Sequence, residues 1–515
     1  MTAIPENLTT PDTLDSSLGR LTFTDGAPSD DAAQKVYDHL DRTHAFNAYM
    51  NGYQLVSLQA LHKGIKAAGV EDNGGVLLFS GLMDSQSMFL TANADTVYYM
   101  FVIDVADGPM VIETPPDALG LFDDFWFQHV IDFGRSGPDR SQGGKFLLLP
   151  PGYDGPMPDS GYHVGRPTTN NIMAFGRSFM TDNDPAPTVA TIKSHLKIYP
   201  YTPGGYGTSI ATLLEGGPLP GKPAEIKPVH YVEGTGLEIN TVPPSDSSYY
   251  DLLNEVVQEQ PSGTLSPEIT GSFAAIGIVK GKKFEPDARM KQILTDASVI
   301  ARATGRAFTW RFRDEDGFGF YPDSAWMNWL FVGGSGFETQ PPAVKDGKIV
   351  PYPPTGYRTL NARFGFFYLA TGVTPAMCML LSDIGSQYLV ACFDSNKKYF
   401  DGAKNYRCTL PPNIPENNFW SFTVYDNQTR SMLQTPQRFP RAGSQSFPSP
   451  AAVPNADGSV DVYFGPEAPK GKEGNWIQTA PGKGWFTILR LYNPLQAFFD
   501  KSWRVGEVTE ITGRD

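Results

Sequence analysis

The sequence predicts a mainly β protein with accessory helices, and two observations support this fold class. Short runs of β-branched and aromatic residues recur along the chain, each ended by Pro, Gly or Asn, which is typical of strands and turns in antiparallel sheets. The composition agrees, because 52 glycines and 44 prolines among 515 residues favour a turn-rich β protein over a helical bundle. A chain of this length exceeds one hydrophobic core, so we expect two or three domains.

The beginning of the chain is predicted as an arm followed by helices. Residues 1–28 are polar and interrupted by proline, which indicates an N-terminal arm. Ser29 or Asp30 can cap a first helix, and a second helical pattern runs over residues 48–68. We therefore predict a helical lead-in over residues 29–75.

The rest of the chain divides into two strand-rich regions and a mixed connection. Strand-like segments separated by Pro and Gly turns predict an N-terminal β-sandwich over residues 76–244. Residues 245–385 are predicted as a helical and aromatic connecting segment, with helices up to about residue 260 and from about Pro286 to residue 304. Residues 386–515 return to the strand pattern and predict a C-terminal β-sandwich.

Charge, cysteine and hydropathy patterns exclude several classes of protein. The net charge is −14 and no block of Lys or Arg forms a basic stripe, which excludes a nucleic-acid-binding role. Three cysteines without a Cys-x-x-Cys spacing predict buried thiols, with a bridge or metal site as the alternative. The uncharged run over residues 364–382 is interrupted by Gly372 and Pro375, so we expect a buried helix there and no membrane contact.

No catalytic signature defines a reaction. The sequence has no His-Glu-x-x-His, no Gly-x-Ser-x-Gly, and neither a nucleotide nor a flavin motif. A divalent metal held by carboxylates or by one histidine stays open as a cofactor.

Two predicted strands resemble each other and suggest an internal duplication. Residues 125–132 and 419–426 share Phe-Trp, then Val, then Asp at equal spacing. Each follows a strand that ends in Pro-Pro-Asp (residues 115–117) or Pro-Pro-Asn (residues 411–413). We therefore predict two related sandwiches in one chain.

Motifs in both halves identify a family resemblance. They are Asn93-Ala94-Asp95-Thr96-Val97-Tyr98, Arg166-Pro167-Thr168, Phe175-Gly176-Arg177, Phe419 to Asp426, Asn475-Trp476 and Leu489-Arg490-Leu491-Tyr492. Together these motifs resemble the bacterial and fungal family that pairs domains of unknown function 1254 and 1214, over roughly residues 45–200 and 390–505. The resemblance implies two jelly-roll-like sandwiches joined through helices and a homo-oligomer, but neither a reaction nor catalytic residues.

The resemblance leaves the location of the protein open. Many members of the family are exported. Residues 1–20, by contrast, have neither a basic n-region nor an apolar h-region. We therefore expect no secretory signal, and a soluble protein in the cytoplasm.

Candidate catalytic residues lie in the N-terminal half. Asp95 precedes a strand, where it either closes a turn or points with Tyr98 into a pocket as a base or metal ligand. His129 is a candidate base, although strand alternation places it on the face opposite Asp132, and a satisfied buried histidine is the alternative. Arg135 is a candidate anion clamp, with a surface ion pair as the alternative.

Candidate substrate-binding residues are Tyr98, Trp126, Arg166, Arg177 and Trp420. The two arginines suit a carboxylate or a sugar hydroxyl, and they equally suit the ordering of a domain junction. Trp420 can stack on a flat ligand, but core packing explains it as well.

Two functional hypotheses follow from these residues. The first is a hydrolase or lyase that acts on a small organic or carbohydrate-like molecule in a cleft of the N-terminal sandwich, with His129, Asp95 and Arg135 at its centre. The second is a non-catalytic ligand-binding or assembly protein.

Overall fold

A computed structural model describes residues 2–202, 214, 226–338, 343–345, 348–350 and 356–511. The chain forms two compact units. Unit 1 comprises residues 1–53, 244–258 and 262–304, and unit 2 comprises residues 54–243, 259–261 and 305–515.

Unit 1 combines a small exposed sheet with helices. The 3₁₀ helix η1 (Glu6–Leu8) precedes the antiparallel strands β1 (Thr13–Ser16), β2 (Gly19–Thr24) and β3 (Ala27–Pro28). The helices of this unit are α5 (Pro267–Ala275) and most of α1 (Asp30–Ala67), α4 (Tyr249–Glu259) and α6 (Ala288–Trp310).

Stacked tyrosines form the contact between α1 and α4. The rings of Tyr49 and Tyr249 stack with their centroids 3.8 Å apart, and the Tyr249 hydroxyl donates to the Tyr49 carbonyl at 2.8 Å. Gly52 lies at the same contact, where a Cβ would stand 2.9 Å from Leu253 Cδ1.

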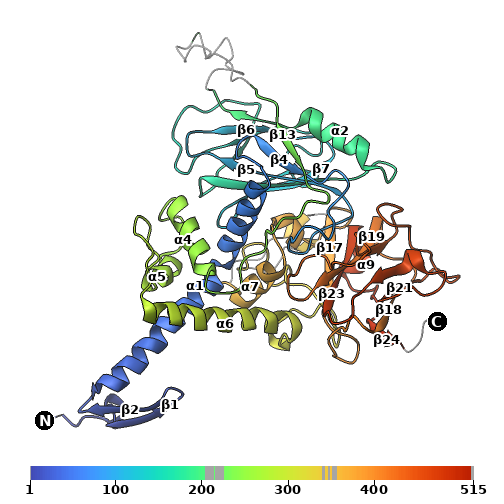
Figure 1. Ribbon diagram of the computed structural model, residues 1–515. Coiled ribbons are helices and arrows are strands. Elements are labelled where there is room, and N and C mark those ends of the chain that lie inside the picture. Colours follow the sequence, from blue (N-terminus) through green and yellow to red (C-terminus); the bar gives the residue numbers. More distant parts are fainter. Residues whose placement is uncertain are drawn as a thin grey trace. The chain divides into compact units, whose positions relative to one another are not determined.

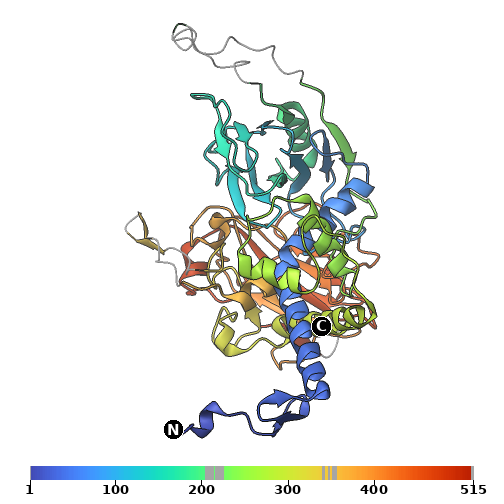
Figure 2. The same cartoon turned by 90° about the vertical axis from the view of Figure 1, so that its left-hand side faces the viewer.

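The helix α1 differs from the sequence expectation. Two helical pieces were predicted, whereas the structure has one continuous helix, visible as an uninterrupted rod in Figures 1 and 2. The region between the two predicted pieces contains neither Pro nor Gly, so nothing there ends the helix.

The N-terminal half of unit 2 is built from two sheets, which we call the N-terminal module. One sheet has the strand order β13-β4-β5-β11-β7-β8 and the other the order β10-β9-β6-β12. Their bounds are β4 (Gly75–Leu78), β5 (Val97–Asp104), β6 (Met110–Glu113), β7 (Ala118–Asp124), β8 (His129–Gly134), β9 (Lys145–Leu148), β10 (His163–Gly165), β11 (Asn171–Ser178), β12 (Lys197–Pro200) and β13 (His230–Glu233). One hydrophobic core collects side chains from both sheets and from α2 (Pro185–His195), so the two sheets form a sandwich.

The C-terminal half of unit 2, the C-terminal module, repeats this plan. Its sheets have the orders β14-β17-β23-β19-β20 and β22-β21-β18-β24, and they too share one core. The bounds are β14 (Trp326–Met327), β17 (Ser386–Ala391), β18 (Asn405–Leu410), β19 (Glu416–Asp426), β20 (Arg441–Gly443), β21 (Val460–Gly465), β22 (Trp476–Gln478), β23 (Trp485–Pro494) and β24 (Thr509–Ile511).

Short elements complete unit 2. They are η2 (Asp314–Asp316), the hairpin β15 (Ala343–Lys345) and β16 (Lys348–Val350), α7 (Leu360–Leu369), α8 (Pro375–Cys378), η3 (Glu473–Asn475) and α9 (Gln496–Phe499). The predicted helix in the uncharged run corresponds to α7, which ends before Gly372. No helix in the described ranges is long and apolar enough to cross a membrane. All three cysteines are buried free thiols, as predicted.

The two modules have the same topology over eight consecutive strands. The sheet orders β10-β9-β6-β12 and β5-β11-β7-β8 correspond strand by strand to β22-β21-β18-β24 and β17-β23-β19-β20. Even the parallel pairs coincide, since β10 runs parallel to β9 and β22 runs parallel to β21. Asp117 and Asn413, at the ends of the two Pro-Pro motifs, both adopt a positive φ between equivalent strands. The structure therefore supports an internal duplication.

The sequence placed part of this duplication in the wrong register. Residues 125–133 were predicted as one strand, but residues 125–128 form a turn in which Phe127 has a φ of 55°, and β8 begins at His129. The Phe-Trp pair of the second copy lies inside β19. Strand pairing aligns Asp124 with Asp426 instead, because both end a strand and accept backbone N–H groups of the following turn.

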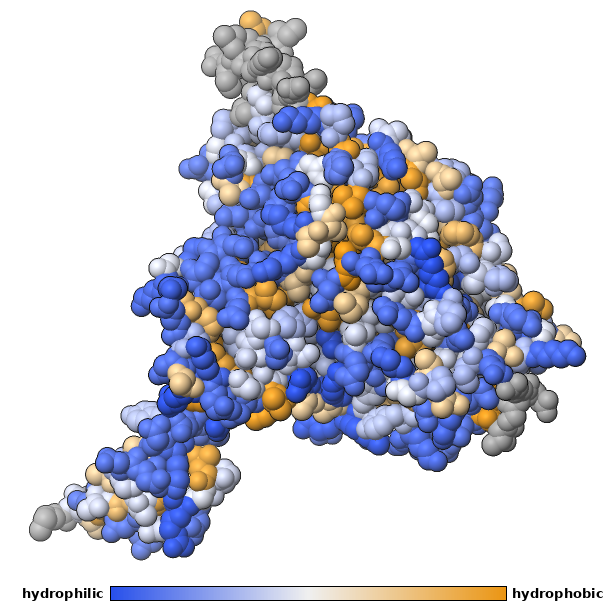
Figure 3. Space-filling view, in the orientation of Figure 1, coloured by the Kyte–Doolittle hydropathy of each residue, from blue (hydrophilic) through white to orange (hydrophobic). Residues whose placement is uncertain are grey.

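The protein is thus a mixed α and β fold with several sheets. Hydrophilic side chains cover most of the face seen in Figure 3.

Candidate functional site

A cavity of about 180 Å³ lies in unit 2 between the two modules. Its walls are the sheet faces that point away from the two hydrophobic cores: β5, β7 and β11 on one side, β17 and β23 on the other. Residues 327–330 and 366–377 close the cavity with mainly apolar side chains. Such a concave apolar space with few polar groups is typical of a small-molecule site.

The polar groups of the cavity form two equivalent cross-strand pairs. Arg177 on β11 faces Tyr98 on β5, and Arg490 on β23 faces Tyr388 on β17. Each arginine also pairs with a second neighbouring strand. Arg177 pairs with the position of β7 five residues before Asp124, and Arg490 pairs with the position of β19 five residues before Asp426. The alignment of the duplicated strands therefore makes the two Tyr–Arg pairs counterparts of each other.

Each arginine reaches across the cavity to the other module. Arg177 donates to the Tyr98 hydroxyl at 3.4 Å and to Ser386 Oγ on β17 at 2.9 Å. Arg490 donates to the carbonyl oxygens of Thr91 and Ala92 at 3.0 and 3.3 Å. Within the described part of the chain, no carboxylate lies at salt-bridge distance from either guanidinium, and Arg490 Nε has no hydrogen-bond partner.

The surroundings shift the pKa values of the two tyrosines in opposite directions. Burial raises the pKa of Tyr98, and the charge of Arg177 offsets this only in part. At Tyr388, burial also acts upward, but the charge of Arg177, the hydrogen bond with Ser386 and the charge of Arg490 lower the pKa below its ordinary value. The cavity therefore combines two positively charged arginine side chains with a mainly apolar lining.

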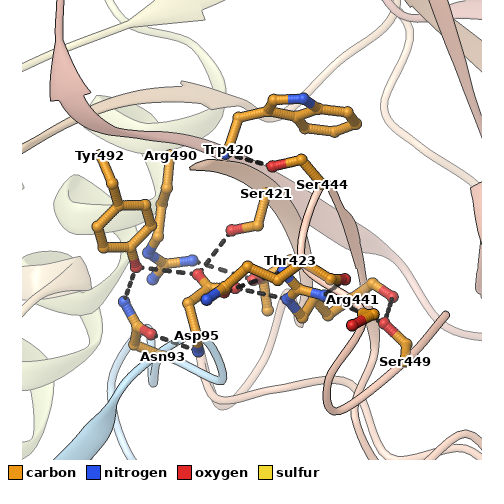
Figure 4. A network of polar contacts seen from close by, with 12 residues as sticks. Asn93, Asp95, Trp420, Ser421, Thr423, Arg441, Ser444, Ser449, Arg490 and Tyr492 are labelled. Carbon is orange, nitrogen blue, oxygen red and sulfur yellow. Dashed lines mark hydrogen bonds and ion pairs between the residues drawn. The ribbon is translucent and has the colours of Figure 1, made fainter. Parts of the chain in front are cut away.

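Asp95 lies outside the cavity lining, in the buried polar network of Figure 4. Its Oδ1 pairs with Arg441 Nε at 2.5 Å, and its Oδ2 accepts hydrogen bonds from Ser421 at 2.6 Å and Tyr492 at 2.9 Å. Burial opposes the charge of Asp95, but Arg441 and Arg490 together hold its pKa below the ordinary value. Both carboxylate oxygens are thus occupied by protein groups.

His129 and two aspartates form a second cluster, beside the cavity wall. His129 Nδ1 lies 3.7 Å from both Asp123 Oδ1 and Asp132 Oδ1, and these three buried atoms have no hydrogen-bond partner in the part of the chain that the structure describes. The other carboxylate oxygens accept from Val373 N at 3.1 Å and Thr374 Oγ1 at 2.8 Å. Strand alternation predicted that His129 and Asp132 would stay apart, but a bulge in the β7–β8 pairing beside His129 brings them close.

The other predicted site residues lie away from the cavity lining. Arg135 stacks over the Phe179 ring at 4.4 Å and donates to Asn493, so it bridges the two modules. Arg166 is exposed, and Trp126 is buried in the turn after β7. Trp420 is buried in the core of the C-terminal module.

Of the predicted site residues, the structure brings Tyr98 and Arg177 together in the cavity. The prediction missed Tyr388, Ser386 and Arg490. The duplication could have revealed these residues. When Asp124 is aligned with Asp426, Arg490 becomes the counterpart of Arg177, and Tyr388, which faces Arg490, becomes the counterpart of Tyr98.

Within residues 2–202, 226–338 and 356–511, no group of three or more His, Cys, Asp or Glu side chains is arranged to hold a metal ion.

These features define a two-sandwich protein with a duplicated Tyr–Arg cavity between its modules. Residues 77–200 match the family model DUF1254 and residues 385–496 match DUF1214, both described as protein of unknown function. The chain thus contains both domains of the family pair that its sequence motifs predicted.

One solved structure with a TM-score above 0.5 supports the fold. The crystal structure of the VPA0106 protein from Vibrio parahaemolyticus, a Northeast Structural Genomics Consortium target, covers 92% of this chain and 100% of its own, with a TM-score of 0.51 and 17% identity. An uncharacterized protein from Burkholderia cenocepacia covers 94% of this chain and 91% of its own, with a TM-score of 0.38 and 13% identity. No curated protein matches the sequence.

Proposed function

We propose that this protein binds a small organic acid in the cavity between its two modules, with the carboxylate at Arg177 and the apolar body against the sheet faces. One observation carries the proposal: the Arg177 guanidinium lies in an apolar cavity with no carboxylate at salt-bridge distance in the described part of the chain. A charge removed from water needs a counter-charge or full hydrogen bonding, and an anionic ligand supplies it.

The wall narrows the class of ligand. Phe89, Leu121, Phe175, Trp329 and Phe366 line the cavity, and they favour a hydrocarbon body over a sugar. The planar guanidinium of Arg177 suits a carboxylate, which it can bind through two parallel N–H donors.

The proposal retains the two-sandwich organisation predicted from the sequence. Each module contributes two four-stranded arrays of equivalent strands, the strand number of a jelly roll, and a jelly-roll-like path is part of this proposal. Hydrolysis or elimination on the bound molecule, the homo-oligomer and the cytoplasmic location also stay predictions. So do the catalytic roles of His129, Asp95 and Arg135, although the occupied carboxylate of Asp95 favours a structural role.

Calorimetric titration with straight-chain carboxylates, hexanoate first, tests the binding proposal. We expect hexanoate to bind the wild type and the Arg177→Met variant to bind at least about tenfold more weakly, a loss of about 1.4 kcal/mol. Arg166→Ala is the matched control, because Arg166 is an exposed arginine outside the cavity lining. If no carboxylate of the series binds, or if Arg177→Met binds as tightly as the wild type, the proposal fails.

A further inference from the structure

The two Tyr–Arg pairs of the cavity are equivalent by duplication but not by surroundings. The Tyr388 hydroxyl lies 2.6 Å from Ser386 Oγ, which also accepts from Arg177. The position equivalent to Ser386 in the N-terminal module is Thr96, whose buried Oγ1 has no hydrogen-bond partner among the described residues. Tyr98 has a longer contact with Arg177, at 3.4 Å.

Tyr388 also lies close to both cations. Ser386 links its hydroxyl to Arg177, and the Arg490 guanidinium lies 5.9 Å from the centre of its ring. Asp95 is already paired with Arg441. Asp95, whose charge also acts on Arg490, lies outside the cavity lining, and among the described residues of the lining there is no carboxylate. An ionised Tyr388 is therefore an anion that the chain can place inside the cavity, beside Arg177 and Arg490.

We propose that Tyr388 is the proton acceptor of the cavity: a phenolate held close to Arg177 and Arg490, which takes up one proton when an organic acid binds. The ligand arrives as a carboxylate, so the proton comes from the buffer acid: its bond to hydrogen breaks, the electron pair stays on the buffer base, and a new O–H bond forms at the Tyr388 oxygen. Arg177 then pairs with the carboxylate of the ligand. The lowered pKa of Tyr388 and the raised pKa of Tyr98 agree with this assignment. The phenolate stands independently, whereas the coupling to ligand rests on the proposed function.

Ultraviolet titration of the ligand-free protein tests the phenolate. We expect the absorbance to show one tyrosine that ionises below the ordinary pKa of about 10. This transition disappears in Tyr388→Phe and persists in Tyr98→Phe, which is the matched control on the equivalent strand. Identical titration of the wild type and Tyr388→Phe overturns the assignment.

A second variant keeps the test decisive if Tyr388→Phe does not fold. Ser386→Ala removes the hydroxyl that contacts Tyr388 and leaves the tyrosine in place. The early transition is then expected to move to higher pH in a protein with unchanged circular dichroism. A transition that stays where it was overturns the assignment.

Hexanoate titrations in two buffers of different ionisation enthalpy test the coupling to ligand. Above the pH of the early transition, we expect the wild type to take up close to one proton per hexanoate and Tyr388→Phe to take up none. Binding of hexanoate without proton uptake in the wild type overturns the coupling. A phenolate in a protein that does not bind hexanoate upholds the titration assignment and refutes the proposed function, so the two failures are distinguishable.

Discussion

Asp95 and Arg441 form an ion pair in which both side chains are fully buried, with Oδ1 2.5 Å from Nε. Asp95 belongs to the loop before β5, and Arg441 begins β20, so the pair joins the two modules of unit 2. Asp95 also accepts from Ser421 and Tyr492 of the C-terminal module. The loop between β4 and β5 is thereby anchored on the duplicated sheet.

Asp95→Ala is expected to destabilise the protein by about 3–5 kcal/mol, because it leaves the Arg441 charge buried without its partner. Urea denaturation at neutral pH measures the loss. Since the folded pKa of Asp95 lies below its unfolded value, this contribution is present at neutral pH and disappears as the pH falls through the folded value. Asp15→Ala, which breaks an exposed pair with Arg20, serves as the control and should cost less than about 1 kcal/mol. A loss for Asp95→Ala no larger than the control would refute the anchoring role.

The His129 cluster is expected to make the protein more stable under mildly acidic conditions. Burial raises the pKa of Asp123 to about 6, against the opposing charge of His129. Burial lowers the pKa of His129, but Asp123 and Asp132 more than offset this, so its pKa is raised. Both folded pKa values lie above the unfolded ones, so both contributions weaken stability as the pH rises from about 4 through 6 and beyond.

The variant Asp123→Asn measures how much Asp123 contributes to this dependence of stability on pH. We expect the wild type to lose on the order of 2 kcal/mol from this group over that interval, and the variant to show a flatter dependence in urea denaturation. Asp107→Asn, at an exposed position, is the matched control and should follow the wild-type dependence. Parallel curves for Asp123→Asn and the wild type would show that the carboxyl does not titrate in this range.

Gly176→Ala is expected to destabilise the N-terminal module by about 1–3 kcal/mol or more through overpacking. Gly176 lies in the central strand β11, where a Cβ would stand 2.1 Å from Cε2 of the buried Tyr99. Gly271→Ala in α5 is the control, because no atom lies within 4 Å of its Cβ position and alanine favours a helix. Thermal melts should show a lower midpoint for Gly176→Ala and an equal or higher one for Gly271→Ala. Equal midpoints for Gly176→Ala and the wild type would mean that Tyr99 moves aside freely.

Trp420→Ala separates core packing from ligand stacking. Because Trp420 is buried in the core of the C-terminal module, its truncation should cost about 3–5 kcal/mol of stability and leave hexanoate affinity unchanged. Urea denaturation and calorimetric titration on the same sample measure the two effects. Lost affinity at unchanged stability would instead place Trp420 at the ligand.

The sequence revealed much of the fold because its signals were local. Period-2 patterns and turn residues predicted the two strand-rich regions, and the shared Pro-Pro-Asp and Pro-Pro-Asn motifs marked equivalent turns, where Asp117 and Asn413 both tolerate a positive φ. The break after Asp124 escaped prediction, because residues 125–128 have the composition of a strand although they form a turn.

Only half of the candidate site could be predicted from the sequence. Tyr98 and Arg177 follow from motifs of the N-terminal module, but Tyr388 and Arg490 require the correct register between the copies. The Phe-Trp match hid that register by pairing Asp426 with Asp132 instead of Asp124. The roles considered for Asp95 and Trp420 depended on exposure, which strand alternation does not report when both faces of a sheet are covered.

The repeated strand order also bears on the ancestry of the cavity. If each module descends from one copy, the face that carries the Tyr–Arg pair once met an identical face, as in a dimer with twofold symmetry. A symmetric pocket treats both of its halves alike. Fusion into one chain removes that restriction. Ser386 and Thr96 could then become different residues, and one half of an originally symmetric pocket could acquire a charge that the other half lacks.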